Sequence, residues 1–215
     1  MNDPARLVPA LLDQVGCVWL ETVIVASIGD CFDLSLSVGA HTASMRGSGE
    51  RAIGGVTSGA MKLGDTVTWR ARHFGVAFRM TSAITSYEYP RRFVDEQQRG
   101  PFRQWRHEHT FTAMPDGKTQ MIDVVEFKSP LGSAGSIADG LLLRHYLPRL
   151  LRQRNTWLKA TLEATIAAPG SLYRHPGGML VRRRCQAGLG CRAGHRGSTA
   201  SRHGVRARTL ACSLL

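Results

Sequence analysis

Alternating apolar and polar residues fill most of the segment from residue 66 to residue 128. Short segments rich in Gly and Pro, such as Gly100-Pro101, interrupt the alternation and favour tight reversals. Because strand side chains alternate between faces, the pattern predicts five strands joined in an antiparallel meander. Their expected ranges are Thr66–Phe74, Val76–Glu88, Phe93–Gln98, Phe102–Ala113 and Thr119–Lys128.

The segment before the meander combines one strand with short helices. Trp19–Ala26 is expected to be the first strand, and Ser27 can cap a helix that ends near Gly39, since its hydroxyl satisfies a free amide of the first turn. His41–Gly49 is expected to be a second short helix or a loop. The glycines at 47, 49, 54, 55 and 59 match no nucleotide-binding fingerprint, so they indicate turns and an irregular edge strand.

Beyond Ser133 the apolar period changes from two residues to that of a helix. Six leucines fall on one broad stripe, while Arg144, Arg152, Arg154 and Lys159 fall mostly elsewhere. The pattern predicts a helix over Ser136–Glu163 that is kinked and not broken by Pro148. The stripe consists of Leu143, Leu147, Leu150, Leu151, Leu158 and Leu162.

Two histidines share the aromatic face of one predicted strand. Alternation places Trp105, His107, His109 and Phe111 on the same side. If the last hairpin pairs Ala113 with Thr119, then His109 lies opposite Asp123, and a hydrogen bond between them would fix the imidazole tautomer and raise its pKa. A slip of two residues would place His107 there instead.

The segment FVDEQ, then GPF and WxHxHxF, followed by DxVxF and PLG, carries a family resemblance. It resembles uncharacterised members of the START-like (SRPBCC) superfamily, which includes polyketide cyclase/dehydrase and coenzyme-Q-binding relatives. The resemblance covers about Val18 to Glu163. It implies an α+β helix-grip fold, in which a curved antiparallel sheet wraps around a long C-terminal helix and a hydrophobic ligand cavity lies between them.

The inward faces of these elements define the candidate site. The resemblance implies that it binds or carries a lipid-, quinone- or polyketide-like molecule. No cofactor or metal is expected, because residue spacing places no paired metal ligands on one site. The expected ligand-binding residues are Trp69, His73, Phe78, Met80, Trp105, Phe111, Met121, Val125, Phe127, Leu143, Leu147 and Leu151. A planar, mostly apolar compound would place its rings against Trp105 and Phe127 and an oxygen near the two histidines.

Three alternatives to a simple carrier remain open from the sequence. A cyclase or dehydratase would use His107 or His109 as general acid or base, with Asp123 orienting the imidazole. In a structural interpretation, His and Asp satisfy only each other and hold the strand register. An interaction module would present an exposed apolar patch instead of a cavity. Asp95 and Glu96 are expected to be solvated or paired with Arg more often than to line a cavity.

Charge and composition divide the chain into three parts. Nine arginines and no Asp, Glu or Lys occur in residues 166–215, so most of the net charge of +12 lies there, and residues 1–165 carry only +3. The expected division is a loose leader (1–17), a ligand-binding domain (18–165) and a disordered or out-of-frame tail (166–215). Because the basic excess is confined to the tail, it argues against a nucleic-acid function.

The five cysteines, at positions 17, 31, 185, 191 and 212, form no regular framework, which indicates reduced thiols and a cytoplasmic protein. The spacing of the tail cysteines and histidines fits no compact zinc motif. No segment has the run of about 18 apolar residues that a transmembrane helix needs. Oligomeric state and ligand identity are not determined by these patterns.

Overall fold

The structure is a computed structural model that describes residues 16–128, 132–167, 173–174, 180–181 and 205–211. The predicted meander is present as β3 (Thr66–His73), β4 (Val76–Glu88), β5 (Arg92–Arg99), β6 (Gln104–Ala113) and β7 (Thr119–Lys128). A 3-10 turn, η3 (Pro115–Gly117), connects the last two strands. Each strand pairs antiparallel with the next. The alternation therefore located all five strands to within two residues at each end.

The predicted register of the last hairpin is confirmed. Ala113 pairs with Thr119, His109 with Asp123 and Trp105 with Phe127, without a slip. β7 alternates strictly between buried and half-buried residues. Because a shift of one residue would turn its apolar side chains to the other face, this strong alternation excludes such a shift.

Two strands far apart in the sequence extend the sheet beyond β7. β1 (Gly16–Ile24) pairs with β7, and β10 (Val205–Ala211) pairs with β1. At the other edge, β2 (Arg51–Gly55) pairs with β3 through an irregular register, as expected for the glycine-rich segment. The full order is β10-β1-β7-β6-β5-β4-β3-β2. A separate pair consists of β8 (Tyr173–Arg174) and β9 (Leu180–Val181).

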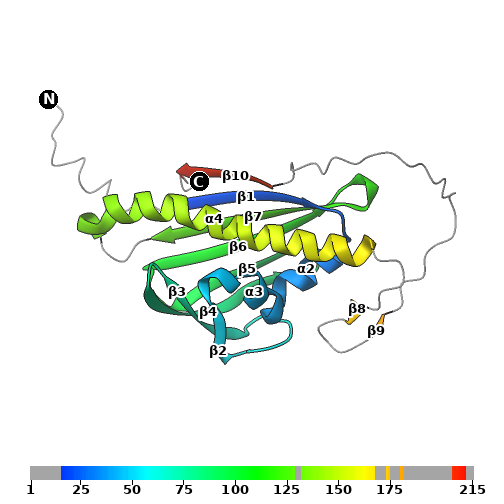
Figure 1. Ribbon diagram of the computed structural model, residues 1–215, viewed down its shortest axis with the longest axis horizontal. Coiled ribbons are helices and arrows are strands. Elements are labelled where there is room, and N and C mark those ends of the chain that lie inside the picture. Colours follow the sequence, from blue (N-terminus) through cyan, green and yellow to red (C-terminus); the bar gives the residue numbers. More distant parts are fainter. Residues whose placement is uncertain (1–15, 129–131, 168–172, 175–179, 182–204, 212–215) are drawn as a thin grey trace, which may run out of the picture.

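The ends of the expected domain differ from the structure. β1 begins at Gly16, inside the expected leader, and a Cβ at Gly16 would come within 2.4 Å of the Phe127 ring. β10 lies within the range assigned to the tail, yet it adds a strand to the sheet (Figure 1). The rest of the leader and most of the tail lie outside the described residues.

Two short helices follow β1. Ser27 caps α2 (Ile28–Leu36) by accepting a hydrogen bond from the Asp30 amide at 3.2 Å, as predicted. This helix ends at Leu36 and not near Gly39, because Ser37 caps a new helix, α3 (Val38–Ser44), through the Ala40 amide. A 3-10 turn, η2 (Arg46–Ser48), completes the segment.

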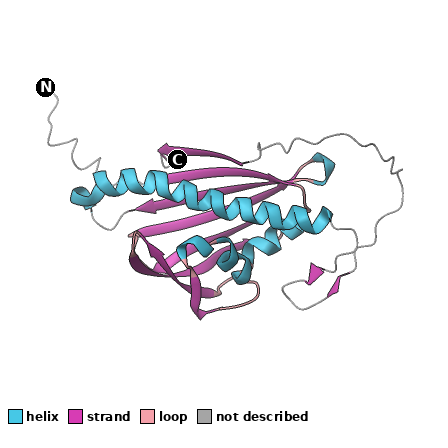
Figure 2. Cartoon of the chain, in the orientation of Figure 1, coloured by secondary structure: helices cyan, strands magenta, loops and turns pink. Residues whose placement is uncertain are grey.

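The long helix α4 (Gly132–Ala167) extends a few residues beyond both predicted ends and continues through Pro148. It lies lengthwise across one face of the curved sheet, with α2 and α3 beside it on the same face (Figures 1 and 2). The chain thus has the predicted α+β helix-grip architecture. Among the described residues, no helix combines the length and the apolar character needed to cross a membrane.

Two buried clusters fill the layer between sheet and helices. One surrounds Phe32 of α2, whose ring makes edge contacts with Phe93 and Phe111. The other joins β1 and β7 to Leu147 and Leu151 of α4. Apolar packing is therefore concentrated under α2 and along the β1–β7 side of the sheet.

Candidate functional site

A cavity of about 420 Å³ lies between the sheet and α4. Leu147 and Leu151 of α4 form part of its wall, facing Trp69 of β3 and Trp105 of β6. Eight of the expected ligand-binding residues line it: Trp69, His73, Phe78, Met80, Trp105, Leu143, Leu147 and Leu151. His107 and His109 also line it.

Four expected ligand-binding residues lie outside the cavity wall. Phe111 and Met121 belong to the cluster around Phe32, because α2 covers that end of the sheet. Val125 and Phe127 pack with β1 and α4 in the second cluster. All four side chains lie on the helix-facing side of the sheet, as predicted. Helices pack directly against them, so they are buried and do not border the cavity. Facing inward on the sheet was therefore not sufficient to place a residue in the cavity.

A cluster of two histidines and two aspartates forms one polar part of the site; we call it the His–Asp cluster. Its members are Asp95 of β5, His107 and His109 of β6, and Asp123 of β7. Since β6 lies between β5 and β7, its histidines have a carboxylate on either side. His107 is directly opposite Asp95, and His109 is directly opposite Asp123.

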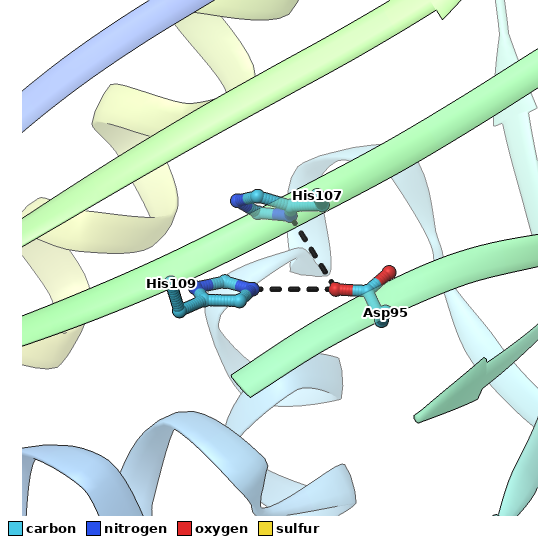
Figure 3. Close-up of side chains that lie close together, drawn as sticks. All are labelled: Asp95, His107 and His109. Atoms are coloured by element: carbon cyan, nitrogen blue, oxygen red, sulfur yellow. Dashed lines mark hydrogen bonds and ion pairs between the residues drawn. The ribbon is translucent and has the colours of Figure 1, made fainter. Parts of the chain in front are cut away.

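Each histidine contacts both carboxylates. His107 Nε2 lies 3.0 Å from Asp123 Oδ1, and its Nδ1 lies 3.6 Å from Asp95 Oδ2. His109 Nε2 lies 3.3 Å from the same Asp95 oxygen (Figure 3). His109 Nδ1 lies 2.7 Å from Asp123 Oδ1, but the geometry is poorly aligned for a hydrogen bond. Both histidines thus contact both carboxylates. The predicted pairing of one His with Asp123 is only part of this arrangement.

Asp123 is fully buried and is further held by α4. Asn155 Nδ2 donates to Asp123 Oδ2 at 2.6 Å and also lies 3.1 Å from Thr22 Oγ1 of β1. The Arg154 guanidinium lies 3.4 Å from Asp123 Oδ1 and is itself buried. Helix and sheet are therefore joined by polar contacts at this point, behind the two imidazoles.

Burial and neighbouring charges set the protonation of the cluster. Burial lowers the pKa of His107 to about 4, with a further contribution from His109, against the opposing effect of Asp123. Burial raises the pKa of Asp123, but the contacts from His107 and His109 outweigh it and hold the pKa well below 3.8. The pKa of Asp95 is lowered by the same balance. At neutral pH both carboxylates are therefore ionised and His107 is neutral.

A second polar group lies elsewhere on the cavity wall. His41 Nε2 lies 3.2 Å from Glu50 Oε1, and the His41 ring lies against Trp69 with 4.3 Å between centroids. His73 Nδ1 lies 2.7 Å from the Tyr146 hydroxyl. Burial lowers the pKa of His73. His73 was predicted to face inward, whereas its partner and the His41–Glu50 pair were not foreseen.

Glu96 behaves as the sequence suggested, and Asp95 does not. Glu96 Oε1 lies 3.6 Å from Arg106 Nε, in a charged group with Glu108 and Glu126. Asp95 lines the cavity instead of pairing with Arg. The two neighbours differ because consecutive residues of a strand point to opposite faces of the sheet.

No protein-family model matches this chain, and no curated protein sequence matches it either. Solved structures do match. The Zhui aromatase/cyclase from Streptomyces sp. R1128 is similar with a TM-score of 0.59 and 12% identity, over 73% of this chain and 98% of that one. A START superfamily protein from Mycobacterium smegmatis has a TM-score of 0.53 and 11% identity, over 69% and 98%.

A major latex-like protein from Panax ginseng is similar at a TM-score of 0.51 and 15% identity, over 69% of this chain and 98% of that one. In all three cases nearly the whole of the solved chain is matched. At such low identity the likeness concerns the fold alone.

Proposed function

We propose that this chain, which has the START-like helix-grip fold, binds a hydrophobic small molecule between the sheet and α4. The observation that carries the proposal is the 420 Å³ cavity. Protein interiors contain few voids larger than a water molecule, whereas small-molecule sites are typically about 300–1,000 Å³. A space of this size is much larger than packing defects alone produce.

The chemistry of the wall indicates a mostly apolar ligand with a few oxygens. The Trp105 and Phe102 rings lie with their centroids 4.9 Å apart and are tilted by 35°, and both line the cavity, so they offer an aromatic surface for a ligand ring. Phe102, and not the predicted Phe127, is therefore the ring that lines the cavity beside Trp105. The His–Asp cluster and the group around His73 can each accept or donate a hydrogen bond. A quinone-like, lipid-like or polyketide-like compound meets these requirements.

A second candidate function is a cyclase or dehydratase acting on a polyketide-like substrate. The observation that favours it is that His107 and His109 line the cavity and both contact carboxylates. A neutral imidazole oriented by a carboxylate is a common general base. Turnover with a bell-shaped pH–rate profile that is lost on replacement of His107 would support the enzyme. A bound compound that is released unchanged would support the carrier.

The buried cysteine Cys31 bears on the location of the protein. The Cys31 thiol is buried, and burial raises its pKa to about 11, so it is poorly reactive in the folded protein. This fits the cytoplasmic location proposed from the cysteine content. The proposed partner is the small molecule itself.

Titration of the full chain with 1-anilinonaphthalene-8-sulfonate tests the binding proposal. This apolar aromatic anion should bind with a saturable increase in fluorescence and should raise the melting temperature, because a ligand that binds only the folded state stabilises it. A saturating change that fits one site per chain is the expected result. No saturable binding, together with no change in melting temperature, would contradict a ligand-binding cavity.

A further inference from the structure

Three atoms of the His–Asp cluster converge on one point beside the cavity. They are His107 Nδ1, His109 Nε2 and Asp95 Oδ2, and these ligand atoms all lie within 4.8 Å of one another (Figure 3). We propose that they form a binding site for a divalent transition-metal ion of the Zn²⁺ type. Sequence spacing does not predict a metal here, because the pairing of β5 with β6 is what brings Asp95 next to the histidines.

Two of the three separations match those expected around a metal ion. Asp95 Oδ2 lies 3.6 Å from His107 Nδ1 and 3.3 Å from His109 Nε2. Ligands about 2.0–2.2 Å from a tetrahedral Zn²⁺ are about 3.3–3.6 Å apart. The two histidine nitrogens also lie within 4.8 Å of each other, so the three atoms can surround one ion.

The opposite nitrogens of both rings lie next to the carboxylate of Asp123. His107 Nε2 is hydrogen-bonded to Asp123 Oδ1 at 3.0 Å, whereas His109 Nδ1 lies 2.7 Å from the same oxygen but is poorly aligned for a hydrogen bond. A carboxylate behind a metal-bound imidazole fixes the tautomer and strengthens the nitrogen as a ligand. Asp123 is in turn fixed by Asn155 and Arg154 of α4. For His107, the outer partner of a metal-binding histidine is thus in place.

The contact between His107 Nδ1 and Asp95 Oδ2 is too long for a hydrogen bond, since the two atoms lie 3.6 Å apart. Both residues line the cavity. A cation between the two atoms would contact both of them.

The type and accessibility of the ligands indicate the kind of ion. Two imidazoles and one carboxylate suit Zn²⁺ or Fe²⁺, whereas Mg²⁺ and Ca²⁺ prefer oxygen ligands. Asp95, His107 and His109 all line the cavity, so further coordination positions would face it. An oxygen of a bound molecule could occupy such a position. The metal proposal does not require that a molecule be bound.

Calorimetric titration of the chelator-treated, full-length protein with Zn²⁺ tests this site. The expected result is one tightly bound ion per chain and a raised melting temperature. Asp95→Asn should weaken the binding by about tenfold or more, as loss of one ligand or of its support commonly does. Glu96→Gln is the matched control, since Glu96 is adjacent in β5 but pairs with Arg106 on the other face, and it should leave Zn²⁺ affinity unchanged.

The absorption spectrum of the Co²⁺-loaded protein provides a second measurement. Nitrogen and oxygen ligands should give visible d–d bands without the near-ultraviolet charge-transfer band of thiolates, which distinguishes this site from cysteine ligands. A thiolate spectrum, no stoichiometric binding, or equal Zn²⁺ affinities of wild type and Asp95→Asn would each overturn the proposal. If Asp95→Asn does not fold, the wild-type spectrum decides. Since no organic molecule is present, failure here would leave the proposed ligand binding unaffected.

Discussion

Asp123→Asn is expected to lower the free energy of unfolding by about 3–5 kcal/mol, because it removes one partner from a buried group of charges. Asp123 is fully buried and contacts two imidazoles, the Arg154 guanidinium and the Asn155 amide. The amide replacement keeps the shape but leaves the Arg154 charge without its carboxylate. Denaturant melts at neutral pH measure the loss.

Glu88→Gln is the matched control for a carboxylate near the surface. Its side chain is 64% exposed and lies 3.1 Å from Arg92, and such exposed pairs contribute about 0–1 kcal/mol. Adding Arg154→Met to Asp123→Asn should recover part of the lost stability, because it removes the uncompensated charge. A loss for Asp123→Asn no larger than that for Glu88→Gln would show that the cluster contributes little to stability.

The stability difference should also depend on pH in a defined direction. The pKa of Asp123 is held well below 3.8 in the folded protein, so its charge stabilises the fold at any pH above its ordinary pKa. That contribution is lost as the pH falls from the ordinary pKa through the folded one. The gap between wild type and Asp123→Asn should therefore be full at neutral pH and should narrow in acid below about pH 4.

Leu147→Trp is expected to weaken binding of 1-anilinonaphthalene-8-sulfonate by at least about tenfold, which corresponds to about 1.4 kcal/mol. Leu147 is buried and lines the cavity from α4. A larger ring at this position extends into existing empty space, so the variant should fold normally while leaving less room for a ligand. Fluorescence titration and the melting temperature without probe measure the two effects.

Leu63→Trp is the control for the added indole itself. Leu63 is 62% exposed and is not part of the cavity wall, so this variant should bind the probe like the wild type. Equal affinities of Leu147→Trp and wild type would place the probe outside the cavity. An unfolded Leu147→Trp would instead show that the residue is packed too tightly to border an empty space.

The parts of the fold that the sequence predicted are those with strong alternation. β7 is buried at every second residue, and its partner β6 carries Trp105, His107, His109 and Phe111 on one face, so a pairing shifted by one residue would expose several of them. The same regularity predicted that His107 and His109 face inward. What it could not show is which inward residues a helix would cover.

The leucine pattern of α4 indicates the contacts that Arg154 and Asn155 make with Asp123. Leu147, Leu151, Leu158 and Leu162 are spaced so that Arg154 and Asn155 fall within the same stripe, between Leu151 and Leu158. The expectation that Arg154 lies outside the stripe rests on its residue type, and it is wrong, because Arg154 is buried. The position of Arg154 and Asn155 inside this leucine stripe predicts that both side chains are buried. Since a buried Arg needs an acidic partner, the stripe also indicates an ion pair with an Asp or Glu of the sheet.

Asp95 was harder to place. Asp95 of β5 follows two apolar residues, Phe93 and Val94, which point to opposite faces and are both 2% exposed. Alternation therefore does not distinguish the face of Asp95 from that of Glu96. The strand also has an irregular register against β4, which weakens any extrapolation from its neighbour. Only the three-dimensional pairing identifies Asp95 as part of the site.

Native mass spectrometry of the full chain, purified from its own host without denaturation, determines whether the cavity holds a ligand. We expect a mass above that of the polypeptide, by an amount that disappears on denaturation and is recovered as an apolar compound bearing one or a few oxygens. The same compound should be depleted from Leu147→Trp prepared in parallel and retained by Leu63→Trp. A chain that carries no small molecule, and that takes up none from a lipid and quinone extract of its host, would contradict the proposed ligand binding.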